Sequence, residues 1–140
     1  MTIKEIQEEI IDEFSMFEDW MERYEYIIDL GKSLPLIKDE FKIDSNLISG
    51  CQSKVWLHSE IEGDKIRFTA DSDAILTKGI VALLLRVFNN QKPKDILDVD
   101  LYFVDKIGLK EHLSPTRANG LVSMIKQIKL YALAFQSKLS

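Results

Sequence analysis

The sequence contains a single cysteine, and this scarcity excludes several classes of protein. One thiol cannot form a disulfide within the chain, which favours a reducing compartment and leads us to expect a cytoplasmic protein. Structural zinc and iron–sulfur clusters usually take four protein ligands, a number that Cys51, His58 and His112 cannot supply. We therefore expect no metal site and interpret both histidines as ordinary surface or turn residues.

Long hydrophobic runs and basic stretches are also lacking. No apolar run approaches the roughly 18 residues that a membrane helix needs, so we expect no membrane segment. The net charge is −5, with 8 Lys/Arg against 16 Asp/Glu in residues 1–70 and 10 against 7 in residues 71–140. A chain without a basic stripe is a poor candidate for nucleic-acid binding. The 6 glycines are not spaced as a phosphate-binding loop either.

What is present is enough apolar material for a core. A chain of 140 residues with 46% hydrophobic content has the usual size of one domain, so we expect residues 1–140 to form a single domain. Thr2 with Glu5 three residues later is a capping box that predicts a first helix reaching Phe14. Asp19 predicts the start of a second helix, and Gly31 predicts its left-handed stop.

The middle of the chain predicts strands. Residues 55–60 and 65–70 alternate as strands joined across Gly63-Asp64, which is typical of a β-hairpin. A third strand at residues 43–48 would place Cys51 in a connection between strands. The sequence predicts an apolar central helix after Asp73, in which Gly79 indicates close packing against the sheet.

Three further helical segments follow. Pro93 begins a short turn or helix, residues 101–107 are helical before Gly108, and Ser114-Pro115 begins a long amphipathic helix. Together these elements predict an α+β fold, with helices packed on one face of a small three-stranded antiparallel sheet.

Cys51 lies in a segment that has the composition of a loop. Gly50, Gln52, Ser53 and Lys54 surround it, whereas a core cysteine is usually placed among apolar neighbours. Backbone amides in such a turn, with Lys54 nearby, would favour the reactive thiolate. The residues alone leave open a reactive thiol, a packing cysteine in a regulatory binding module, and a thiol hydrolase that pairs Cys51 with His112.

Three separated motifs resemble the SufE family of sulfur-acceptor proteins. They are SGCQSKVW at residues 49–56, DSDAILTKG at residues 71–79 and LKEHLSPTRANGL at residues 109–121. FSMFEDWMERYEYIIDLGKSLP at residues 14–35 is similar to the family's N-terminal helices. The resemblance implies a fold shared with IscU-type scaffold proteins, three antiparallel strands with helices on one side.

The resemblance also implies a function centred on Cys51. In that family, the cysteine accepts sulfur from a persulfide on a SufS-type cysteine desulfurase, stimulates that enzyme, and passes the sulfur to a SufBCD-type iron–sulfur assembly complex. Such a protein is a carrier rather than an enzyme, and it holds no cofactor, because the pyridoxal phosphate belongs to the desulfurase. A partner desulfurase from another sulfur pathway also remains open.

Site residues follow from the same resemblance. It implies that the Cys51 loop rests in a shallow apolar pocket and swings out at Gly50. Arg117 is expected to contact the partner, and Gln52, Ser53, His112 and Asn119 are expected to support the loop and the contact. Ser114 is explained by its place at the start of a helix.

Overall fold

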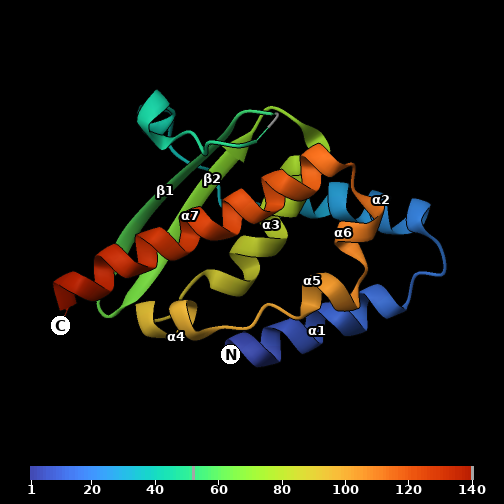
Figure 1. Ribbon diagram of the computed structural model, residues 1–140, viewed down its shortest axis with the longest axis horizontal. Helices are drawn as coiled ribbons and strands as arrows, with labels where there is room; N and C mark the ends of the chain where they lie inside the picture. The colour runs from blue at the N-terminus through green and yellow to red at the C-terminus, as the bar shows by residue number, and fades with distance from the viewer. Residues whose placement is uncertain (52, 140) are drawn as a thin grey trace.

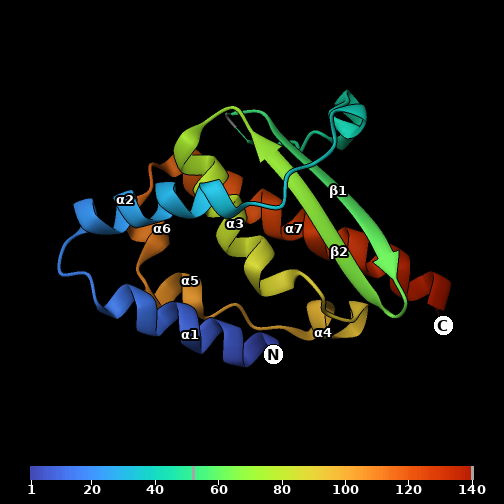
Figure 2. The same cartoon turned by 180° about the vertical axis from the view of Figure 1, so that it is seen from behind.

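The computed structural model describes residues 1–51 and 53–139, and it is a mostly helical α+β fold (Figure 1). A long β-hairpin forms one layer, and α3 and α7 cross its inner face. Seen from behind, the hairpin lies in front of α7, and α3 lies beside it (Figure 2). The predicted class and the packing of helices on one face of the sheet are therefore confirmed.

The hairpin pairs β1 (Val55–Glu62) with β2 (Lys65–Ser72). Its antiparallel register runs from Val55 opposite Ser72 to Glu62 opposite Lys65, and Gly63 turns the chain with a φ of +64°. Alternate residues of β2 are buried, because successive side chains of a strand point to opposite faces. The predicted hairpin is confirmed, and each strand is two residues longer than expected.

The predicted third strand is wrong, because the described residues form a two-stranded sheet. Residues 43–48 contain a 3₁₀ turn, Asp44–Asn46, and pair with the sheet through an isolated bridge from Leu47 to Trp56. The Asn46 side chain donates to the Phe41 carbonyl at 2.7 Å, and the Leu47 amide donates to the Asp44 carbonyl. These local bonds compete with a strand ladder.

The first two helices begin where the sequence predicts. In α1 (Ile3–Ser15) the capping box is complete, with the Glu5 amide 3.1 Å from Thr2 Oγ1. Asp19 caps α2 (Trp20–Leu30) by accepting from the Glu22 amide at 2.9 Å. Helix α2 ends at Gly31 as predicted, but the expected left-handed conformation is wrong, since the φ of Gly31 is −58° and the chain continues into a 3₁₀ turn, Gly31–Ser33.

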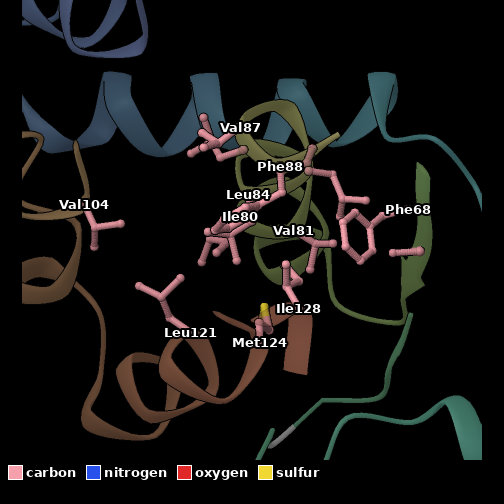
Figure 3. Packing of buried hydrophobic residues seen from close by; sticks show 14 of the residues in the cluster. Phe68, Ile80, Val81, Leu84, Val87, Phe88, Val104, Leu121, Met124 and Ile128 are labelled. Carbon is pink, nitrogen blue, oxygen red and sulfur yellow. The ribbon is translucent and has the colours of Figure 1, made fainter. Parts of the chain in front are cut away.

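Helix α3 (Ile75–Phe88) is the centre of the core. Figure 3 shows its Ile80, Val81 and Leu84 between Phe68 of β2 and Met124 of α7. Gly79 packs against α2 rather than against the sheet, which corrects our expectation. A Cβ at Gly79 would lie 2.0 Å from the Ile27 carbonyl oxygen, so the two helix backbones are in direct contact.

The last third of the chain is helical. It comprises α4 (Pro93–Asp98), α5 (Phe103–Lys106), α6 (Leu109–His112) and α7 (Pro115–Leu139). Gly108, with a φ of +71°, separates α5 from α6, and the Ser114 hydroxyl accepts from the Arg117 amide at the start of α7. Within residues 1–51 and 53–139, no helix is both long and apolar enough to span a membrane.

Candidate functional site

Cys51 lies on the segment that enters β1, beside the first turns of α7. Gly50 immediately before it has a φ of +87°, a left-handed conformation that glycine adopts without strain. A Cβ at Gly50 would lie 2.6 Å from Ser123 Oγ on α7. A sharp turn against α7 therefore requires glycine here, and the sequence-based interpretation of Gly50 as a turn residue is confirmed.

The loop is also fixed at its other end by Asp73. The Lys54 amide donates to Asp73 Oδ1 at 3.1 Å, and the Asp73 amide donates to the Lys54 carbonyl at 3.3 Å. Asp73 therefore ties the Cys51 segment to the start of α3, which begins at Ile75. The carboxylate stabilises the loop that carries the thiol.

The Cys51 side chain is half-buried and points at α7. Its thiol donates a weak hydrogen bond to the Gly120 carbonyl, with the two heavy atoms 3.7 Å apart. A Cβ on Gly120 would itself lie 3.7 Å from Cys51 Sγ, so the sulfur packs directly on the helix backbone. In this conformation the thiol is covered rather than presented at a loop tip.

A small cavity of about 20 Å³ adjoins the sulfur. Its lining comes from the Cys51 loop, α3 and α7, and consists of Cys51, Ser53, Thr77, Ile80, Thr116, Arg117, Gly120 and Met124. A space of this size holds roughly one water-sized atom. Ile80 and Met124 make its inner wall apolar, whereas Arg117 is exposed to solvent.

Burial raises the pKa of the Cys51 thiol above its ordinary value. The cause is desolvation, because a partly buried thiolate loses its interactions with water. The expectation that backbone amides and Lys54 favour the thiolate is therefore wrong for this conformation. The Lys54 residue is exposed, and its amide is bonded to Asp73 instead.

The structure brings some of the predicted site residues together. Ser53 and Arg117 share the cavity with Cys51, and Gly50 directly precedes it. Asn119 is exposed on α7 and does not line the cavity. Gln52, which we also expected to support the loop, lies outside the described residues.

His112 does not join the thiol. Its ring stacks on Trp20 with centroids 3.9 Å apart, and its Nδ1 lies 3.0 Å from the Gly108 carbonyl. The Tyr24 hydroxyl donates to its backbone carbonyl. His58 is likewise stacked on another ring, that of Phe41. Neither imidazole lines the Cys51 cavity, so neither lies where it could act as a general base for the Cys51 thiol.

Several residues around the thiol were missed by sequence reasoning. Thr77, Ile80 and Met124 have the spacing of core residues, and nothing in the sequence relates them to Cys51. Gly120 did carry a signal, because an isolated glycine inside a helical pattern indicates a close approach. That close approach is made by the cysteine itself.

Among the residues that the structure describes, no three His, Cys, Asp or Glu side chains are grouped so that they could hold a metal ion.

The fold resembles the solution structure of a hypothetical protein from Thermus thermophilus, with a TM-score of 0.78 and 19% identity. The similarity covers 94% of this chain and 96% of that one.

Sequence comparison is more specific. The chain is 42% identical over 127 residues to an uncharacterized SufE-like protein of Rhizobium meliloti, covering 87% of this chain and 91% of the relative. A SufE-like protein of Synechocystis is 37% identical over 127 residues, covering 91% of this chain and 80% of the relative. Residues 8–132 match the SufE family, described as an Fe–S metabolism associated domain. The chain therefore belongs to the SufE family.

Proposed function

We propose that this protein is a sulfur acceptor and carrier whose acceptor atom is Cys51 Sγ. The observation that supports it best is a half-buried thiol on a glycine-hinged loop, next to a cavity with room for about one atom. The sulfur donor is a persulfide on a pyridoxal-phosphate cysteine desulfurase of the SufS type. The recipient is a SufBCD-type iron–sulfur assembly complex, consistent with membership of a family associated with Fe–S metabolism.

The chemistry is a thiol exchange at sulfur. The Cys51 thiolate attacks the terminal sulfur of the donor persulfide, a new S–S bond forms on Cys51, and the S–S bond of the donor breaks. The donor cysteine leaves as a thiolate, and the proton lost by Cys51 is taken up by that thiolate or by water. No net oxidation occurs, so the chain needs no cofactor of its own and acts as a carrier rather than as an enzyme.

The resting conformation opposes this attack. Burial raises the pKa of the Cys51 thiol, which disfavours the reactive thiolate, and the sulfur packs against α7. The loop must therefore leave the cavity when the donor binds, and Gly50 supplies the backbone freedom for that movement. Once the loop returns, the apolar cavity protects the outer sulfur from reductants.

Arg117 is the residue we assign to partner contact. It lines the cavity and is exposed, so it is accessible to an approaching protein in a way that the inner residues are not. Ser53 and Gly50 support the loop, whereas His112 and Asn119 lie outside the cavity. We place both of these on the partner-facing surface rather than beside the sulfur.

A turnover assay tests the proposal. L-cysteine is supplied to a purified SufS-type desulfurase without reductant, and alanine release is measured with and without this protein. We expect the wild-type protein to raise turnover, Cys51→Ser to abolish the increase, and Arg117→Ala to weaken it by raising the protein concentration needed for half-maximal effect.

Two outcomes separate the rival functions. Full stimulation by Cys51→Ser would mean a regulatory module that does not use its thiol. Esterase activity of the protein alone, lost in His112→Ala, would mean a hydrolase. Neither result is compatible with the sulfur-carrier proposal.

A further inference from the structure

A second hollow lies on α7, away from the thiol. This α7 groove has a volume of about 460 Å³ and is lined by residues of α7, α4 and α6. Its apolar part consists of Leu97 from α4 and Val122, Ile125, Leu130 and Leu133 from α7. None of these residues lines the Cys51 cavity.

The apolar residues of the α7 groove are exposed to an unusual degree. Val122 is 51% exposed, Leu130 48% and Leu133 51%. An adjacent face of the same helix buries Leu121 and Ile128 in the core, and Ile125 and Leu97 pack partly against that core. Val122, Leu130 and Leu133 extend this apolar surface to solvent, and an exposed apolar patch of this kind marks an interaction surface.

All charged residues that line the α7 groove are lysines, namely Lys110, Lys126 and Lys129. Lys129 Nζ lies 3.4 Å from the Val99 carbonyl, so this side chain is held at the α4 side. In residues 1–51 and 53–139, neither Lys110 nor Lys126 forms an ion pair with a carboxylate. A local excess of positive charge on a chain of net charge −5 favours an occupant that carries carboxylates.

We propose that the α7 groove binds an amphipathic helix of a protein partner, with its apolar side chains in the groove and its Asp or Glu residues beside the three lysines. Recognition of a helix in a groove needs this combination of an apolar floor and a charged rim. The α7 groove shares no lining residue with the Cys51 cavity, and the proposal does not depend on sulfur transfer by Cys51.

A binding titration tests this proposal with a defined probe. The probe is a fluorescein-labelled synthetic peptide about five helical turns long, with leucines at i, i+3, i+4 and i+7 and glutamates on both flanks. Anisotropy should rise on titration with the full-length protein. Leu130→Glu and Lys126→Glu should each weaken binding about tenfold or more, which corresponds to roughly 1.4 kcal/mol.

Matched variants control for surface chemistry alone. Leu36 is 58% exposed elsewhere on the molecule, so Leu36→Glu should bind the peptide like wild type. Lys38→Glu, an exposed lysine outside the groove, should do the same. A peptide with lysines in place of glutamates should bind much more weakly, and circular dichroism should show that all four variants are folded.

Several results would overturn the proposal. The first is absence of peptide binding, and the second is equal binding by wild type, Leu130→Glu and Lys126→Glu. Sedimentation that shows self-association lost in Leu130→Glu would assign the groove to a second copy of this chain. Co-sedimentation with phosphatidylglycerol vesicles, lost in the same variant, would assign it to a membrane surface. No readout here involves sulfur, so failure leaves the sulfur-carrier proposal standing.

Discussion

The proposed function places two conflicting requirements on Cys51. A carrier thiol must reach the active site of another protein, yet a persulfide left in solvent is open to reduction and oxidation. The structure places the sulfur against Gly120 and an adjacent small cavity, where a persulfide would be protected from solvent. Gly50, in a conformation that only glycine adopts easily, satisfies the need for movement.

The protonation state of Cys51 should follow its burial. Desolvation raises the pKa of the Cys51 thiol, and the thiolate is the form that iodoacetamide alkylates. The alkylation rate should therefore increase with pH, and the midpoint of this increase should lie above the ordinary thiol pKa of 9.0. The same protein unfolded in urea should titrate at the ordinary value. A midpoint below that of the unfolded chain would show that the loop stabilises the thiolate in the resting state.

Gly120→Ala should increase the stability of the fold and shorten the lifetime of a persulfide on Cys51. Alanine in a helix interior is favoured over glycine by about 1 kcal/mol, so the variant should unfold at a higher urea concentration. The added methyl group reduces the space beside Cys51 Sγ, so a persulfide formed with a small-molecule donor should be lost to dithiothreitol faster than in wild type.

The control for this variant is Asn119→Ala, one position away and outside the cavity. It should leave the persulfide lifetime unchanged. Equal lifetimes for wild type and Gly120→Ala would mean that the cavity does not shelter the outer sulfur.

At the residue scale, Gly50 and Ser53 lie beside Cys51 because they are its neighbours in sequence. Arg117 is distant in sequence and was expected only from the SufE resemblance, and it lines the same cavity as Cys51. The covered thiol and the role of Gly120 depend on contact across 69 residues of chain, which no local pattern contains.

At the scale of elements, the crossing of α2 and α3 is the tightest contact. Gly79→Ala would place a methyl group 2.0 Å from the Ile27 carbonyl, and a backbone atom cannot move aside as a side chain can. We expect a loss of about 3 kcal/mol or more in the free energy of unfolding, measured by urea denaturation. Gly63→Ala, with a φ of +64° and nothing within 4 Å, should cost less. Equal losses of unfolding free energy in Gly79→Ala and Gly63→Ala would contradict a direct backbone contact between α2 and α3.

Helices α1 and α3 are joined by a salt bridge with a pH signature. Arg86 Nη1 lies 2.9 Å from Glu13 Oε1, and this hydrogen bond holds the Glu13 pKa below its ordinary value. A lowered folded-state pKa gives stability that is present above the ordinary value and lost as pH falls through the folded value. Between about pH 5 and pH 3, wild type should therefore lose more unfolding free energy than Glu13→Gln.

Glu25→Gln serves as the control for that comparison, because Glu25 is exposed on α2. It should lose stability with falling pH as wild type does. If Glu13→Gln lost unfolding free energy with falling pH as steeply as wild type, the Arg86–Glu13 ion pair would make no measurable contribution to stability.

The elements differ in how far the sequence predicts them. Helix starts at Thr2 and Asp19 and the hairpin at Gly63 follow from local hydrogen bonding and local turn geometry, so they were predicted. The strand expected at residues 43–48 was wrong, since Asp44 and Asn46 bond to nearby backbone instead. Gly31 and Gly79 were misread because both serve a contact between helices distant in sequence.

At the scale of the whole molecule, α7 links two surfaces with different chemistry. Thr116 to Met124 contribute to the Cys51 cavity, and Val122 to Leu133 contribute to the α7 groove. The SufE family match spans residues 8–132, which include the whole Cys51 cavity and the α7 groove except Leu133. On our account, one helix carries a sulfur site and a separate docking site, which can be altered independently.

Mass spectrometry of the protein after reaction shows whether Cys51 carries sulfur. The protein is incubated with a SufS-type desulfurase and L-cysteine without reductant, then digested and analysed at the peptide that contains Cys51. We expect one added sulfur atom on that peptide, removed by dithiothreitol and absent from Cys51→Ser. A Cys51 peptide that gains no sulfur while the desulfurase turns over would contradict the sulfur-carrier proposal.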